Sequence, residues 1–299
     1  MGVRGLYSFI KSKGVAISLK EIQQLQTPLR IGIDISYYMY KWQASSAKVL
    51  ELIENLRPHK TILIFDGKAP QEKQQESNRR KQVREEDIVY AKVLRDSISS
   101  IELTEQQKSH LERTAEQLEK RGWQNTRELR HAFKNDLYKN FIPLLKSKGE
   151  ADFLLVSLAA YKDIDIVISG DMDLLVLGVK YQWSPNIDGK TFRIFDRDVI
   201  LDELGINDTQ FRSFCAMCSS DYTKEEQRLD INHAYHGIRI YKTIDSLKDK
   251  HKDWLEEWPP EDHPYFQAPL NPTSWILDEQ MAWYSAWKKD ERMPYREVP

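Results

Sequence analysis

This 299-residue sequence is limited first by what it lacks. Two cysteines are too few for a disulfide framework, which is typical of a protein from a reducing compartment. No apolar run reaches the roughly 18 residues of a membrane-spanning helix, and residues 1–14 are too polar for a secretory signal. We therefore expect a soluble, intracellular protein. Nucleus, cytoplasm and a viral replication compartment are all compatible with the sequence.

The net charge excludes little, because 44 basic and 46 acidic residues leave only −2. Such a balance can conceal charges of opposite sign on different surfaces. Basic residues outnumber acidic ones between 68 and 148, and the densest patch, NRRKQVR (78–84), contains four cations and no acid. A solvated helical face explains much of the segment equally well, but 78–84 is the better candidate for phosphate contacts.

Three short, β-branched segments carry an aspartate at or next to their last position: 29–34, 61–67 and 165–171. Patterns typical of helices lie between them. Buried strands that alternate with helices predict a parallel sheet covered on both faces. In such sheets the ligand site lies outside the carboxyl ends of the strands, so we expect the aspartates to meet there.

Seven acidic residues fall at element boundaries that this sheet would bring to one edge. They are Asp34, Asp66, Glu150, Asp152, Asp171, Asp173 and Asp221. Acids at a helix start commonly cap free N–H groups, which explains one close pair but not seven carboxylates. Crowded carboxylates raise one another's pKa and stay ionised only around cations, and Mg²⁺ and Mn²⁺ prefer oxygen ligands. Two ions roughly 4 Å apart can clamp a displacement at phosphorus, so the set indicates phosphodiester hydrolysis.

Six motifs in the sequence resemble those of the flap endonuclease and XPG family of structure-specific nucleases. They are MGVRGL, IGID, FDGKAP, GEAD, SGDMDLLVLG and SSDY, and they follow the family order over residues 1–221. The EAD residues are most similar to the exonuclease branch. The resemblance implies an α/β, PIN-like fold with a parallel central sheet flanked by helices, an arched helical insertion and a divergent C-terminal helical DNA-binding region.

The resemblance also implies how the carboxylates divide between two Mg²⁺ ions, which Mn²⁺ could replace. One ion would be served by Asp34, Asp66, Glu150 and Asp152, and the other mainly by Asp171, Asp173 and Asp221. Asp34 and Asp171 are the carboxylates whose loss we expect to abolish hydrolysis.

Other residues match family positions that contact nucleic acid. Lys73 and Arg80, seven apart on one helical face, match a basic pair that neutralises the scissile phosphate, although exposed helix cations would be the ordinary interpretation. Tyr40 matches an aromatic on which a splayed base stacks, with a core position as the equal alternative. Gly2 would allow close packing against the substrate or the metal shell, and it is counted among the nucleic-acid contacts. The expected nucleic-acid contacts also include Arg79, Lys81 and Arg84.

The expected organisation has four segments. Residues 1–70 and 149–221 form two parts of a nuclease domain, and 71–148 form the helical arch. Residues 222–299 form a divergent, Trp-rich helical region that packs on the nuclease body, as aromatic-rich tails commonly do.

Two departures from the family pattern concern its partners. A glycine hairpin that holds a duplex phosphate normally follows SSDY within about ten residues, whereas only Gly237 occurs in 223–244. The duplex anchor is therefore altered or displaced. The stretch QMAWYSAW (280–287) lacks the residues of a sliding-clamp peptide, so clamp binding is not predicted.

A zinc site is a competing interpretation of Cys215, Cys218, His233 and His236, although the histidine spacing is shorter than usual. The leading hypothesis is a Mg²⁺-dependent nuclease that cuts DNA at 5′ flaps, junctions or 5′ ends. The same centre acting on RNA is the alternative, because no base-edge reader or 2′-hydroxyl contact is recognisable. A catalytically silent scaffold is disfavoured by the complete ligand set.

Overall fold

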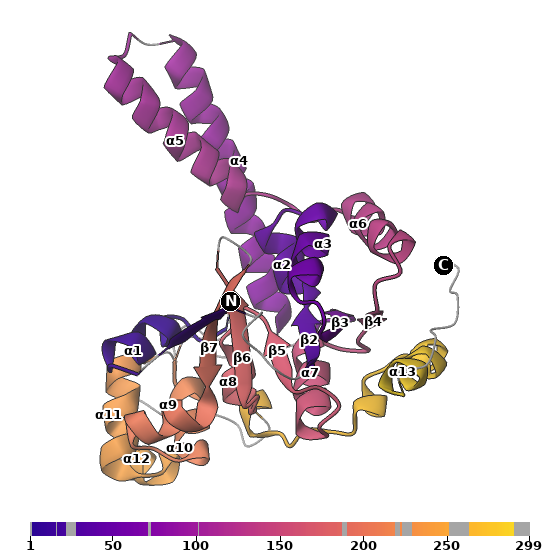
Figure 1. Ribbon diagram of the computed structural model, residues 1–299. Coiled ribbons are helices and arrows are strands. Elements are labelled where there is room, and N and C mark those ends of the chain that lie inside the picture. Colours follow the sequence, from indigo (N-terminus) through magenta and orange to yellow (C-terminus); the bar gives the residue numbers. More distant parts are fainter. Residues whose placement is uncertain are drawn as a thin grey trace.

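The computed structural model describes residues 2–15, 17–21, 28–70, 73–100, 102–186, 190–218, 222, 229–250 and 263–289. Within this part of the chain, seven strands form one sheet in the order β1-β7-β6-β5-β2-β3-β4, with helices on both faces (Figure 1). Among the same residues, no helix combines the length and the apolar character needed to span a bilayer.

The centre of the sheet is parallel and its β1 side is antiparallel. The strands are β1 (Ser18–Glu21), β2 (Arg30–Asp34), β3 (Lys60–Phe65), β4 (Leu144–Lys146), β5 (Ile166–Ile168), β6 (Tyr181–Pro185) and β7 (Thr191–Asp196). Strands β4, β3, β2, β5 and β6 run parallel, whereas β7 pairs antiparallel with β6 and with β1. The predicted parallel sheet is thus confirmed, with the correction that the sheet is mixed. The short β-branched runs predicted β2, β3 and β5.

Alternating side chains divide the core between the two faces. Ile62 and Ile64 of β3 belong to one apolar cluster, and Leu63 and Phe65 belong to the other. Successive side chains of a strand point to opposite faces, so a strand buried on both sides must be apolar throughout.

Helices from different parts of the chain complete the two clusters. The first cluster contains residues of α1 (Leu6–Ser12), α7 (Ala151–Ala160), α8 (Asp173–Leu177), α9 (Arg197–Leu204), α10 (Asp208–Ala216), α11 (Ile231–Tyr241) and α12 (Ile244–Lys250). The second contains residues of α2 (Ile35–Lys41), α3 (Ser46–Asn55) and α6 (Arg127–Lys139).

A long helical hairpin projects from the body beside α2 (Figure 1). It consists of α4 (Gln74–Ser100), about 40 Å long at 1.5 Å per residue, and α5 (Glu105–Arg121). A capping box at Thr104 starts α5, and ion pairs from Arg95 to Glu119 and from Arg121 to Asp87 tie the two helices together. We call this hairpin the arch. Helix α6 does not project, because it packs against α3 on the body.

The C-terminal segment runs from the carboxyl edge of the sheet, where Trp275 and Ile276 contact Lys148 and Ser147, to the opposite ends of the strands, which α13 covers. After the short 3₁₀ helices η5 (Pro264–Phe266), η6 (Pro272–Ser274) and η7 (Asp278–Gln280), it ends in α13 (Met281–Lys288). The Trp287 indole N–H donates to the Thr61 carbonyl oxygen over 3.2 Å, and Lys288 pairs with Asp163 at 2.6 Å. Trp254 and Trp258 lie outside the described residues.

Two sequence features acquire a structural meaning in this region. Gly237 lies within α11, where an added Cβ would be 3.3 Å from the Leu247 side chain, so it is a close-packing position and not a hairpin glycine. Cys215 and Cys218 are buried in the core, while His233 and His236 are exposed on α11. No group of three metal-ligating side chains is found among the described residues, so the zinc interpretation gains no support.

We expect Trp287→Ala to lower the free energy of unfolding by about 3–5 kcal/mol, because the side chain is 1% exposed and its removal leaves a cavity and an unpaired carbonyl. Chemical denaturation followed by circular dichroism measures the change. Phe141→Ala is the control, since Phe141 is 82% exposed and its loss should cost little. Equal stabilities of the two variants would contradict the packing described for α13.

Candidate active site

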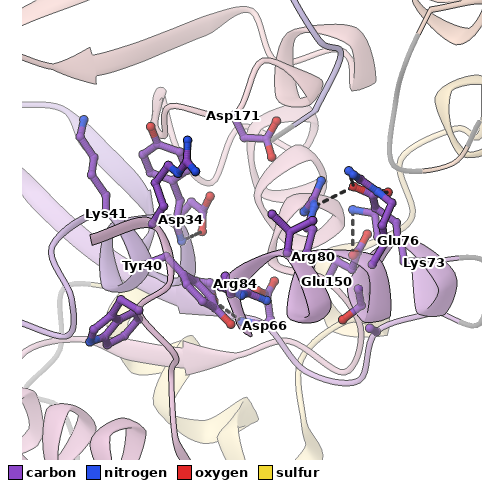
Figure 2. A pocket seen from close by; sticks show the side chains of 18 of the residues that line it. Asp34, Tyr40, Lys41, Asp66, Lys73, Glu76, Arg80, Arg84, Glu150 and Asp171 are labelled. Atoms are coloured by element: carbon purple, nitrogen blue, oxygen red, sulfur yellow. Dashed lines mark hydrogen bonds and ion pairs between the residues drawn. The ribbon is translucent and has the colours of Figure 1, made fainter. Parts of the chain in front are cut away.

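A cavity of about 840 Å³ lies between the carboxyl edge of the sheet and the base of the arch (Figure 2). Five of the seven predicted carboxylates line it: Asp34, Asp66, Glu150, Asp152 and Asp171. They come from the ends of β2, β3 and β5 and from the start of α7, which are adjacent because β2 pairs with both β3 and β5. Asp221 lies outside the described residues.

Asp34 and Asp66 are held by hydrogen bonds at the ends of neighbouring strands. Asp34 accepts from the Tyr37 amide at 3.0 Å and from the Ser169 hydroxyl at 2.8 Å. The Asp66 carboxylate accepts from the Ala151 amide at 2.9 Å, which connects β3 to the start of α7. Both carboxylates therefore keep a defined orientation although they lie close to other acids.

The Glu150 carboxylate forms an ion pair with a lysine and accepts a hydrogen bond from a tyrosine hydroxyl. One of its oxygens lies 2.9 Å from the Lys73 ammonium, and the other accepts from the Tyr222 hydroxyl at 2.5 Å. The same ammonium lies 4.5 Å from the centre of the Tyr222 ring. Lys73, immediately before α4, thereby joins the arch to the carboxylate edge.

Asp171 and Asp173 lie against the N-terminal segment of the chain. The Val3 amide donates to Asp173 at 2.7 Å, and the Asp173 amide donates to Asp171 at 3.1 Å. Gly2 has a positive φ of 79°, and a Cβ there would lie 2.1 Å from an Asp171 oxygen and 2.5 Å from an Asp173 oxygen. Only glycine fits at this position. Asp173 is 1% exposed and does not line the cavity.

Burial and mutual repulsion leave two carboxylates poorly compensated. Burial, with the charge of Asp66 next, raises the pKa of Asp34 to about 7. Burial raises the pKa of Asp152 well above its usual range, and Asp171 and Asp34 raise it further. A cation in the cavity would lower both pKa values and favour the ionised forms.

The donor set fits Mg²⁺ or Mn²⁺, since the acidic residues in the cavity offer only carboxylate oxygens. Among the described residues, no three acidic, imidazole or thiol side chains already converge as the ligands of one ion. Mg²⁺ commonly keeps several waters and takes one or two carboxylates directly, so a wide arrangement suits it better than a closed cage.

Basic side chains of the arch face the carboxylates across the cavity (Figure 2). Arg79 and Arg80 both pair with Glu76, at 2.8 and 2.9 Å. Hydrogen bonding from Arg79, with smaller contributions from Arg80, lowers the pKa of Glu76 to about 2. Lys81 does not line the cavity; it is exposed and pairs with Glu85.

Tyr40 lines the cavity and is 38% exposed, so it is not a core residue, whereas Tyr38 is fully buried. Its ring meets Trp123 edge to face at 5.8 Å and the Arg84 guanidinium at 5.4 Å. Trp123 was not among the predicted residues, because its closeness to Tyr40 arises from the return of the chain after α5. Tyr222 was also missed, although it directly follows the predicted Asp221.

Comparisons with known proteins agree with this arrangement. The profile of the XPG I-region matches residues 141–221. The chain is 25% identical to the probable RAD2-like endonuclease 369L of Invertebrate iridescent virus 6, over 83% of this chain and 73% of that protein. It is 27% identical to flap endonuclease 1 of Zea mays, over 70% of this chain and about half (53%) of that protein.

The chain is therefore similar to proteins of the flap endonuclease and XPG family. The catalytic core of Rad2, solved in complex with a DNA substrate, has the same fold at 15% identity, with a TM-score of 0.60 over 100% of this chain and 89% of that one. The expected PIN-like fold is thus confirmed.

The pKa of Asp34 predicts how stability depends on pH. Because the folded state holds this proton up to about pH 7 and the unfolded chain loses it near pH 4, Asp34 makes the protein less stable as pH rises between these values. In chelator-treated protein, Asp34→Asn should therefore be more stable than the wild type at pH 8 and similar to it at pH 4. Thermal unfolding measures both.

Asp202→Asn is the matched control, since Asp202 is exposed on α9 away from the cavity. It should follow the wild type at both pH values. An Asp34→Asn variant less stable than the wild type at pH 8 would show that the hydrogen bonds from Tyr37 and Ser169 outweigh repulsion.

Proposed function

We propose that this protein is a metal-dependent, structure-specific nuclease that hydrolyses phosphodiester bonds in DNA during replication, repair or recombination. The observation that carries the proposal is the meeting of five carboxylates at one sheet edge, directly opposite the cations at the base of a helical arch. The names of the relatives, RAD2-like endonuclease and flap endonuclease 1, and the DNA bound to the Rad2 core support DNA as the substrate.

The carboxylates would hold two Mg²⁺ ions, which Mn²⁺ could replace. Asp34, Asp66, Glu150 and Asp152 form one ligand group, and Asp171, Asp173 and Asp221 form the other. Bound divalent ions would activate water and neutralise charge on the phosphate. Ser169 and the amides of Tyr37, Ala151 and Val3 orient the ligands, and Gly2 leaves room for Asp171 and Asp173.

Lys73 and Arg80 would supply positive charge to the scissile phosphate. Both line the cavity from the arch base, and each is paired with a carboxylate that a phosphate could replace as an anionic partner. Charge placed where negative charge develops stabilises the transition state without reorganisation during the reaction. Arg79 and Arg84 line the same wall and would bind neighbouring phosphates.

Tyr40 would stack with a base of the strand that enters the cavity. Its ring is partly exposed and is held by Trp123 and Arg84, so it is a stacking surface fixed before binding. Residues 1–70 and 149–221 would act as the nuclease domain, 71–148 would include the arch, and 222–299 would be the divergent helical region that packs on the nuclease body.

We expect the purified protein to cleave 5′-flap DNA in Mg²⁺ and to lose this activity in a chelator or with Asp171→Ala. Gel analysis of end-labelled flap DNA, nicked duplex, single-stranded DNA and matched RNA measures it. Junction-dependent DNA cleavage supports the proposal. RNA cleavage in preference to DNA, lost in the same variant, would contradict the assignment of the substrate; activity unchanged by Asp171→Ala would contradict the assignment of the site.

Lys73→Ala and Arg80→Ala should each slow single-turnover cleavage by about 100-fold or more, since a contribution of about 3 kcal/mol at the transition state corresponds to that factor. Lys81→Ala is the control on the same helix, because its side chain is exposed and outside the cavity. Its rate should stay close to that of the wild type. Equal cleavage rates for all three variants would contradict the proposed role of Lys73 and Arg80 in stabilising the transition state.

A further inference from the structure

A second hollow adjoins the cavity at Tyr40. It has a volume of about 280 Å³ and shares Ser36, Tyr40 and Asp66 with the first. Its remaining wall is formed mainly by α6, with single residues from α2, β3 and β4 and from the loops before α6 and after β3. Five basic side chains line it: Arg127, Arg130, His131, Lys134 and Lys146. We call this hollow the basic pocket.

The basic residues of α6 share one helical face. Positions 127, 130, 131 and 134 follow the spacing of three and four residues that aligns side chains on a helix. The acids of the same helix, Glu128 and Asp136, do not line the pocket. The helix therefore turns its positive charge toward Tyr40.

The basic side chains outnumber the acids around them: Asp66 is the one acidic residue among those described that line the pocket, and Glu128 lies near Arg127 and His131. Among the described residues, none of the five basic side chains forms an ion pair, in contrast to Arg79, Arg80 and Arg121 of the arch. Burial lowers the pKa of Lys134, and the nearby charges of Lys146 and Arg130 lower it further. An excess of cations around one carboxylate attracts an anionic ligand.

Two further features indicate a nucleotide chain as the ligand. Met39 and Phe65 give the pocket apolar surface, and the buried Asn125 Oδ1 has no hydrogen-bond partner within the described part of the chain. Such a pocket offers contacts to phosphate, to a base or sugar face and to a polar edge. Sequence-independent binding of single strands combines the same kinds of contact.

We propose that the basic pocket binds the phosphates of a single strand that passes Tyr40 on the side away from the scissile bond. The inference rests on the proposed function, because it assumes that a base stacks on Tyr40. Because the two hollows share Ser36, Tyr40 and Asp66, one strand that stacks on Tyr40 can contact both. The pocket would make affinity depend on the length of the single-stranded flap.

The test compares two double variants in an Asp171→Ala background, which prevents cleavage. Arg130→Ala with Lys146→Ala removes two exposed charges from the pocket, one from α6 and one from β4. Lys48→Ala with Lys139→Ala is the matched control, since both are exposed, lie on α3 and α6, and line neither hollow. Fluorescence anisotropy measures the Kd for DNA with a long or a one-nucleotide 5′ flap.

We expect the pocket variant to bind the long flap about tenfold more weakly, with the dependence of log K on log salt reduced by about 1.4 for two lost phosphate contacts. Its affinity for the one-nucleotide flap, and both affinities of the control, should stay unchanged. Equal weakening for both flaps, or no weakening, would overturn the proposal. Because the assay measures binding, it stays decisive even if the wild type cleaves neither DNA, a result that would contradict the nuclease function alone.

Discussion

The repulsion between carboxylates gathered at one edge of the sheet is the interaction on which the rest of the structure depends. Parallel pairing of β2 with β3 and β5 makes the aspartates at their ends neighbours, and burial makes the charges of Asp34 and of the nearby Asp152 costly. The fold meets this cost with fixed dipoles: the Ser169 hydroxyl for Asp34, the Ala151 amide for Asp66, and the Val3 amide for Asp173. These bonds orient the oxygens but leave the pKa of Asp34 near 7. The residual cost is the free energy that a divalent cation can recover on binding.

The positive charge of the protein is divided between two surfaces with different roles. At the arch base, Lys73 and Arg80 are paired with Glu150 and Glu76, so they are held in position next to the carboxylates. In the basic pocket, which Asp66 also lines, the cations form no ion pair with another described residue, and burial and the charges of Lys146 and Arg130 lower the pKa of Lys134. A net charge of −2 therefore conceals the segregation that the sequence only suggested. Tyr40 lies where the two surfaces meet, which is why its ring can belong to both hollows.

The sequence predicted the features that depend on local pattern. Apolar, β-branched runs followed by aspartate predicted β2, β3 and β5. The motif resemblance predicted a common site for the five carboxylates that line the cavity: Asp34, Asp66, Glu150, Asp152 and Asp171. The sequence could not predict contacts between residues that are far apart in the chain. Examples are the edge-to-face packing of Trp123 on Tyr40, the hydrogen bond from Tyr222 to Glu150, and the position of the α6 cations beside β4. The sequence did not predict the antiparallel strands β1 and β7, because neither segment is a continuous apolar run like those of β2, β3 and β5. A run of basic residues in the sequence does not tell which side chains face the cavity. Arg80 and Arg84 line it, whereas the helical periodicity places Lys81 outside it.

The most direct test of the account is to locate Mn²⁺ by anomalous diffraction in crystals of the wild-type protein. Anomalous peaks should lie in the cavity, one among the oxygens of Asp34, Asp66, Glu150 and Asp152 and one beside Asp171. Their absence at millimolar Mn²⁺, or ions bound only elsewhere on the surface, would contradict the claim that these carboxylates are gathered to hold divalent cations.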